Sequence, residues 1–566
     1  MTDVGVVSHD PDNGVAWSGN AFTVSRKQRF GLGVLSLLVL AILVLAPLLG
    51  WFRVVRLSPV VAGASLLALA ILRPWRQPGA ARRLSVWEPS RRAVTIGAAG
   101  GALLLFWCVL TRFYSGQINA IDFTVYYDRP CYQTVIGNPL FVEVSDSPGH
   151  SFRSELADHA YWVMLPICSL YAIKASPLWL HLIPALAVAG GAVFVLRVLK
   201  AVSVPGIIAS AAAAAFVLND NTARALNYGF HPEVLYMLFV PWIIDAALRG
   251  ARLSFLVAVC GCVLVKESAF LPLFAASTAV GLHRGRTMGR GDRVLFLLFP
   301  TLLALANVGF YYAFVVPLLT GETRPAYAHF WGNYGSAPHW ALVGMLRDPF
   351  RVLADVRGSG IGKVLAPFLM VLPLLGWRFV IGLLPIVLIF GASANDQVRD
   401  FGIYYALPLV PCLVLGAAEG VTRSLGFWKR LGPAQGRVAA AAVLLAGAVL
   451  VGGTHRGYSL RTWRAELPVV PEALSLFADE PVILVQSGLF PHAGYDSRFR
   501  LLTPESLHAP GNATAVVLLG SGLSAYPFGA KVPRHDAHLA ALLATPSLRP
   551  LPAGLHAVRV SALGSP

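Results

Sequence analysis

Residues 178–196 read LWLHLIPALAVAGGAVFVL, and this stretch decides the fold. A helix that crosses the hydrocarbon core of a bilayer needs roughly 20 predominantly apolar residues, and Leu178–Leu196 has that length and composition. The chain of 566 residues is 56% hydrophobic and only 13% charged, with a mean hydropathy of +0.64. Because so apolar a chain cannot be covered by a polar shell, we predict a membrane protein.

Similar apolar runs lie on both sides of this stretch, and several are shorter than an ideal span. Together they predict an all-α polytopic membrane protein with about 13 transmembrane helices. The other candidate spans are Phe30–Trp51, Val60–Leu72, Ala93–Leu110, Pro205–Leu218, Val234–Leu248, Leu253–Val265, Ser268–Leu282, Val294–Leu319, Val364–Leu375, Phe379–Ala392, Phe401–Leu415 and Val438–Gly452.

Basic residues predict how these spans are oriented. The formal net charge is +17, and the Lys and Arg residues lie in short loops between apolar runs. Such loops are retained in the cytoplasm, so Arg26, Lys27 and Arg29 place the N-terminus inside. The charge therefore indicates contact with anionic membrane lipids, and we expect no nucleic acid as a partner.

Strict alternation of the spans divides the chain into four regions. They are a cytoplasmic tail (1–29), two extra transmembrane helices with a basic cytoplasmic loop (30–92), a transmembrane core (93–453) with long external loops (112–159 and 320–363), and an extracytoplasmic C-terminal domain (454–566). The apolar segment Tyr161–Ile173 breaks the alternation if it spans. We therefore interpret it as a re-entrant or interfacial helix.

The C-terminal region differs in composition from the core. PVILVQ (481–486) and AVVLLG (515–520) are short β-type runs separated by turn-rich segments, and residues 537–543 fit a helix. This pattern predicts a small α/β unit.

The cysteines indicate neither a disulfide framework nor a metal cluster. Cys131 stands alone in a polar loop, and the other cysteines lie in or beside apolar stretches. No Walker-type loop, GxSxG, HExxH or paired CxxC motif is present. ATP-driven transport and hydrolase chemistry therefore have no sequence support.

Polar residues gather at the predicted outer ends of the spans. Charged groups at membrane depth are costly and usually line a site or a pathway, so the convergence of separate segments on one rim predicts a site. The residues are Asp122; Asp158 and His159; His231 and Glu233; Lys266 and Glu267; and Arg399, Tyr404 and Tyr405.

These side chains could carry out a group transfer. Asp122 could accept a proton from an attacking hydroxyl, with Asp158 as the second candidate catalytic acid. Lys266, Arg399 and His231 could stabilise a phosphate leaving group. Carboxylates beside phosphate favour Mg²⁺ or Mn²⁺. The candidate ligands of such an ion are Asp122, Asp158 and Glu233, and the remaining candidates for substrate binding are His159, Glu267, Tyr404 and Tyr405.

Each feature also has a purely structural interpretation. Lys266 and Glu267 could form an ion pair that caps a helical hairpin. Pro232 after His231 could simply begin a helix, and Asp122 could be a solvated loop acid. External aromatic residues fit an interfacial belt, with sugar stacking as the alternative; they are Phe330, Trp331, Tyr334 and Trp340.

Five segments together resemble a known family. They are DFTVYYDRPCYQTVIGN (122–138), LADHAYWVMLPICSLYAI (156–173), ALNYGFHPEVLYMLFVPW (225–242), LVKESAFLPLFAASTAVGL (264–282) and YYALPLVPCLVLGAAEG (404–420). In this order they resemble a large prokaryotic family of predicted multi-span membrane proteins of unknown function. That family is similar in layout to the glycosyltransferase C superfamily, and the resemblance covers roughly Ala93–Gly420.

The resemblance implies a glycosyltransferase C-like fold with its active site at the outer membrane face. Such enzymes take a sugar from a polyprenyl-phosphate carrier, and an acid after the first core span is essential. That acid would be Asp122, with Asp128 as the neighbouring alternative, while His231 and Lys266 would contact the donor phosphate. The paired acidic motif and the WWD-type motif of better-known members are absent.

We therefore expect a glycosyltransferase in the bacterial inner membrane that transfers a sugar to an envelope lipid, glycan or protein. The alternative is a transporter or flippase of a lipid-linked or anionic envelope precursor, in which the same residues would line a passage. A third hypothesis is a non-catalytic scaffold whose tail binds envelope partners. Clustering of the acids at one rim favours the enzyme.

Overall fold

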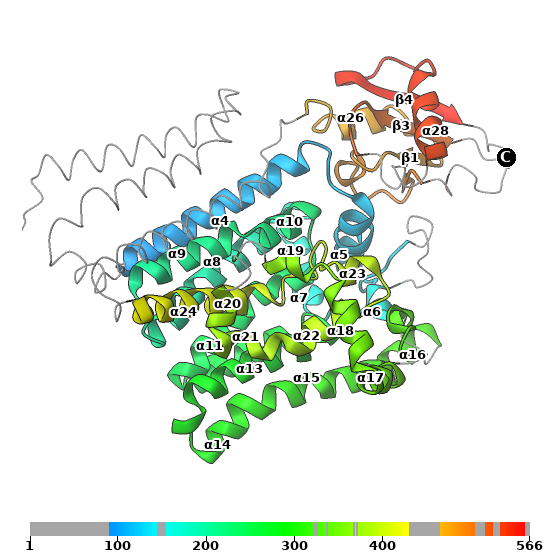
Figure 1. Ribbon diagram of the computed structural model, residues 1–566. Helices are drawn as coiled ribbons and strands as arrows, with labels where there is room; N and C mark the ends of the chain where they lie inside the picture. The colour runs from blue at the N-terminus through cyan, green and yellow to red at the C-terminus, as the bar shows by residue number, and fades with distance from the viewer. Residues whose placement is uncertain are drawn as a thin grey trace, which may run out of the picture. The chain divides into compact units, whose positions relative to one another are not determined.

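Figure 1 shows a computed structural model of the protein, which consists mostly of helices with one small sheet. The structure describes residues 90–143, 154–321, 326–335, 338–365, 368, 372–428, 464–503, 506, 515–524 and 533–560. The chain divides into two compact units, Met1–Pro59 and Val60–Pro566, and all of these residues belong to the second. The predicted N-terminal tail and the spans Phe30–Trp51, Val60–Leu72 and Val438–Gly452 lie outside the described residues.

Three helices in the described part are long and apolar enough to cross a membrane. They are α4 (Arg91–Phe113), α8 (Leu178–Ala201) and a continuous helix, Arg290–Thr320, made of α14, η8, α15, η9 and α16. These elements agree with the predicted spans at Ala93, Leu178 and Val294. Long apolar side chains on α4 and α15 are exposed, as expected of surfaces that face lipid.

Shorter helices fill the space between these three. They are α9 (Gly206–Leu218), α10 (Asp220–Tyr228), α11 (Tyr236–Arg249), α12 (Arg252–Val263), α13 (Phe270–Arg284), α17 (Pro338–Arg347), α18 (Pro349–Arg357), α19 (Ile361–Leu365), α20 (Leu372–Leu375), α21 (Trp377–Val380), α22 (Leu384–Gly391), α23 (Asp396–Arg399) and α24 (Val410–Trp428). Helices α8 and α11 pack closely because Gly191 has no side chain: a Cβ there would lie 2.0 Å from the carbonyl oxygen of Met237.

One predicted span begins at a different residue. Phe401–Leu415 was expected to be helical throughout, but residues 401–409 form turns and α24 begins only at Val410. Pro411 lies in the first turn of α24, where its missing N–H is harmless, whereas Phe401 and Ile403 have positive φ and cannot continue a helix.

Short helices line the end of the molecule that bears the candidate residues. They are η2 (Ile121–Asp128), α5 (Arg129–Val135), α6 (Glu155–Asp158), α7 (Met164–Cys168), η4 (Ser169–Ala172), η5 (Pro232–Leu235) and η6 (Glu267–Ala269). The segment Tyr161–Ile173 forms α7 and η4, which are far too short to span a bilayer.

A disulfide joins Cys131 of α5 to Cys168 of α7, so the prediction of no disulfide framework was wrong for this pair. The two residues are 37 positions apart in different segments, and only the packing of α5 on α7 brings them together. Disulfides persist in oxidising compartments, which agrees with the predicted external position of this region.

The C-terminal region contains a four-stranded sheet with the order β2-β1-β3-β4. Its strands are β1 (Ile483–Val485), β2 (Phe499–Leu501), β3 (Ala515–Gly520) and β4 (Leu555–Val560), and its helices are α26 (Val470–Ser475) and α28 (Pro533–Ala544). Strand β1 is parallel to β2 and β3, while β4 is antiparallel to β3. Both predicted β-type runs and the predicted helix are therefore confirmed.

Candidate active site

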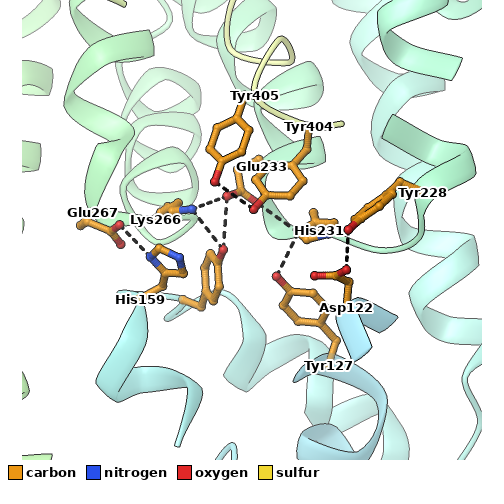
Figure 2. A network of polar contacts seen from close by, with 11 residues as sticks. Asp122, Tyr127, His159, Tyr228, His231, Glu233, Lys266, Glu267, Tyr404 and Tyr405 are labelled. Atoms are coloured by element: carbon orange, nitrogen blue, oxygen red, sulfur yellow. Dashed lines mark hydrogen bonds and ion pairs between the residues drawn. The ribbon is translucent and has the colours of Figure 1, made fainter. Parts of the chain in front are cut away.

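Side chains from several short helices and turns form one polar network (Figure 2). Asp122 and Tyr127 come from η2, and His231 and Glu233 lie at the start of η5. Lys266 lies at the turn between α12 and α13. Tyrosine hydroxyls connect the acids and bases into pairs. Together with His159 and with Tyr404 and Tyr405, five segments that are distant in the sequence thus meet.

Asp122 is the acid at one end of the network. Its Oδ2 accepts hydrogen bonds from the hydroxyl of Tyr228 and the side-chain amide of Asn119. Burial raises the pKa of Asp122 to about 6, although the bond from Tyr228 lowers it. Asp122 is therefore a carboxyl group poised to exchange a proton near neutral pH.

His231 is 4% exposed, and its ring stacks on Tyr228, which donates to Asp122. Its Nδ1 is 3.1 Å from the hydroxyl of Tyr127, and its ring stacks on Tyr404 with centroids 3.8 Å apart. Among the described residues, Nε2 of His231 has no hydrogen-bond partner. Burial lowers the pKa of His231 to about 3, so the ring is neutral at physiological pH.

Lys266 and Glu233 form a buried ion pair in the middle of the network. Nζ of Lys266 donates to Oε1 of Glu233 at 2.6 Å and to the hydroxyl of Tyr161 at 3.2 Å. That hydroxyl donates in turn to Glu233 at 3.2 Å. Burial opposes the charge of Lys266, but Glu233 and Glu267 raise its pKa above the ordinary value. Both partners therefore stay ionised.

His159 and Glu267 form the far end of the network. Nδ1 of His159 lies 2.9 Å from Oε1 of Glu267, and the backbone N–H of Ala160 donates to Oε2 at 3.0 Å. Burial raises the pKa of Glu267, but His159 and the other donors outweigh it and hold it at about 2. The predicted ion pair between Lys266 and Glu267 was therefore wrong, because Lys266 pairs with Glu233 and Glu267 with His159.

Two predicted site residues lie differently from the rest. Arg399 pairs with Asp396 on α23, and its side chain is 39% exposed. The structure does not bring Arg399 into the network. Asp158 ends α6, one residue before His159, and is half-buried. Tyr404 and Tyr405 do join the network, with their hydroxyls 3.3 Å apart.

Three tyrosines were missed in the sequence: Tyr127, Tyr161 and Tyr228. All three lie inside the conspicuous segments, within one to five residues of a predicted site residue. Tyrosine is also common at membrane interfaces, so its identity alone gave no signal. The usable signal was that each of these tyrosines lies close in the sequence to a candidate site residue of the same segment.

The described residues contain no group of three or more His, Cys, Asp and Glu side chains close enough to hold a metal ion. Glu233 in particular is committed to Lys266. The expected Mg²⁺ or Mn²⁺ ligands Asp122, Asp158 and Glu233 thus do not meet as one group in the described part of the chain.

Fold and site together define a helical membrane protein with a buried polar network at one end of its helices. The chain belongs to the family described as "Predicted membrane protein (DUF2079)", which matches residues 112–492. The predicted family is therefore confirmed. No curated protein matches the chain.

Two solved structures are similar to the chain at low identity. ArnT from Cupriavidus metallidurans, bound to undecaprenyl phosphate, is 13% identical with a TM-score of 0.45, over 84% of this chain and 100% of that one. Arabinofuranosyltransferase AftD from Mycobacteria is 16% identical with a TM-score of 0.43, over 86% of this chain and 40% of that one. The chain therefore spans less than half the length of AftD.

Proposed function

We propose that the protein is a membrane glycosyltransferase that moves a sugar from a polyprenyl-phosphate donor to an envelope acceptor at the outer face of the inner membrane. The observation that carries the proposal is that Asp122, His231 and Lys266 meet in one network. Tyr228 donates to Asp122 and stacks on His231. Glu233 lies 4.0 Å from His231 and accepts from Lys266. The network joins a carboxyl group with a pKa of about 6 to donors that suit a phosphate.

The reaction assigns each group a role. The acceptor oxygen attacks the anomeric carbon of the sugar, and its proton passes to the carboxylate of Asp122. The bond between that carbon and the phosphate oxygen breaks, and the electron pair leaves with the lipid phosphate. Attack from the face opposite to the phosphate inverts the configuration.

Lys266 and His231 would receive the phosphate. The ammonium of Lys266 has three N–H groups, and the bonds described above occupy two of them, to Glu233 and Tyr161. Neutral His231 offers Nε2, which is buried without a partner among the described residues. Fixed donors in a site screened from water stabilise developing charge without reorganising.

The distribution of charge along the continuous helix Arg290–Thr320 supports an external site. Arg290 and Arg293 lie in α14 at one end, while α16 at the other end packs against α6. Figure 1 shows α14 and α16 at opposite ends of α15. Basic residues mark the cytoplasmic side, so the site would lie on the outer side.

The test is turnover of radiolabelled polyprenyl-phosphate sugars by purified protein in lipid, following release of the lipid phosphate. Asp122→Asn should lower turnover by about 10²–10⁴-fold while donor binding persists, because an amide cannot accept the proton. Asp396→Asn is the matched control, since this acid is exposed on α23. A chelator in parallel reactions reads out any need for Mg²⁺ or Mn²⁺.

Equal turnover in wild type and Asp122→Asn would refute Asp122 as the base. If no donor is consumed and the protein instead moves a labelled lipid across vesicles, the transporter is the correct function.

A further inference from the structure

The helix that carries Asp122 is shared between two hydrophobic cores. Phe123 and Tyr127 of η2 pack in the core of the helical region. Ile121 and Val125, on other positions of the same helix, pack in the core of the C-terminal sheet with residues such as Leu489. One face of η2 therefore packs against the C-terminal region.

Hydrogen bonds from the C-terminal region hold both ends of η2. At its start, the backbone N–H of Ala120 donates to Oγ of Ser487 at 3.1 Å. At its end, the hydroxyl of Tyr495 donates to Oδ1 of Asp128 at 2.9 Å. Both Ser487 and Asp128 are buried, at 1% and 2% exposed. Because these bonds are buried away from water, breaking them is costly, and they fix the position of the backbone.

Further contacts continue this attachment into α5. Arg129 donates to the carbonyl oxygen of Phe499 at 2.8 Å, and its guanidinium lies 4.2 Å from the ring centroid of Phe490. Tyr132 stacks on Tyr495 with ring centroids 4.4 Å apart. The C-terminal region thus contacts the chain on both sides of Asp122.

We propose that the C-terminal region is a structural part of the active site, with Ser487 and Tyr495 as positioning residues for Asp122. Ser487 holds Ala120. Tyr495 together with Tyr171 of η4 holds Asp128. These bonds fix η2, and with it the placement of Asp122 beside Tyr228 and of Tyr127 beside His231. The effect of this positioning on catalysis rests on the proposed glycosyltransferase function, whereas the positioning itself does not. Asp128, the neighbouring candidate acid, is thereby an anchor point rather than the base.

Hydrogen exchange of the full-length protein in lipid tests the positioning directly. The double variant Ser487→Ala with Tyr495→Phe should raise amide exchange across residues 119–128 about tenfold or more, because each lost bond weakens local protection about fivefold. The control is Arg559→Gln, which removes a pair with Glu480 inside the C-terminal region. It should leave that exchange unchanged.

Turnover separates positioning from general stability. In the double variant kcat should fall while KM for the donor stays the same. The acid limb of the pH profile of kcat, which reports Asp122, should also move. Asp128→Leu, which removes the acceptor of the Tyr495 hydroxyl, should also lower kcat, and Asp128→Asn, which keeps an acceptor oxygen, should lower it less.

Unchanged exchange at 119–128 in the double variant would overturn the inference. Raised exchange in that variant supports it even if wild type transfers no sugar, in which case the proposed function alone fails.

Discussion

The two halves of the polar network, one around Lys266 and one around Asp122, stabilise buried charge in different ways. Around Lys266, two carboxylates have fixed partners: Glu233 accepts from the ammonium of Lys266 at 2.6 Å, and Glu267 lies 2.9 Å from Nδ1 of His159. Around Asp122, the hydrogen bonds of the carboxylate come from neutral groups, Tyr228 and Asn119. One half is a fixed electrostatic structure, whereas the other is built around a group that can change charge.

The pKa values follow this difference. Opposite charges keep the pKa of Lys266 above its ordinary value and that of Glu267 near 2, so neither titrates near neutral pH. Asp122 has no such compensation in its hydrogen bonds, and burial raises its pKa to about 6. A proton acceptor and a permanent charge can therefore lie in one network without interfering.

The largest effect should come from breaking the charged half. Lys266→Met leaves Glu233 buried without its partner, which destabilises by about 3–5 kcal/mol. Thermal unfolding in detergent measures the loss. The double variant Lys266→Met with Glu233→Gln should recover most of it, because no uncompensated charge remains. If the single and double variants melt alike, the pair does not carry this stability.

The pH dependence of turnover tests the half of the network around Asp122. Asp122 acts as a base only when ionised, so turnover should fall about tenfold per pH unit below the pKa of about 6. Tyr228→Phe removes the hydrogen bond that lowers this pKa, and the acid limb should move to higher pH. Rate profiles from pH 4 to 9 measure both. A limb that stays in place after Tyr228→Phe would contradict the assignment to Asp122.

A smaller effect is expected at the neutral hydroxyl of Tyr161, which contacts both members of the ion pair between Lys266 and Glu233. Tyr161 donates to Glu233 and accepts from Lys266. Tyr161→Phe should destabilise by about 1–2 kcal/mol, because the ion pair itself remains. Chemical unfolding monitored by intrinsic fluorescence gives the value. A loss as large as that of Lys266→Met would mean that the hydroxyl, rather than the charge pairing, holds the site together.

The smallest effect should come from the residue outside the network. Arg399→Gln removes an exposed pair with Asp396, and stability should change by less than about 0.5 kcal/mol. Turnover should also be unchanged. A loss of donor binding in this variant would return Arg399 to the substrate site, as the sequence alone had suggested.

Much of the helical framework could be predicted from the sequence, because hydrophobic length is a local property. Leu178–Leu196 predicted α8 within a few residues, and AVVLLG predicted β3 at its observed bounds. The start of α24 was missed because Phe401–Leu409 is as apolar as a helix. Its backbone instead turns at positive φ, which only the surrounding packing stabilises.

Composition and apolar periodicity by themselves determined that this chain is a helical membrane protein, and charge placement made Asp122, His231 and Lys266 candidate site residues. Only the tertiary structure decided which partner each group has: Lys266 pairs with Glu233 rather than Glu267, and Cys131 pairs with Cys168. The reason is that pairing depends on distances between segments that are far apart in the sequence. Those distances are set by helix packing and, for Asp122, by the C-terminal region against which η2 packs.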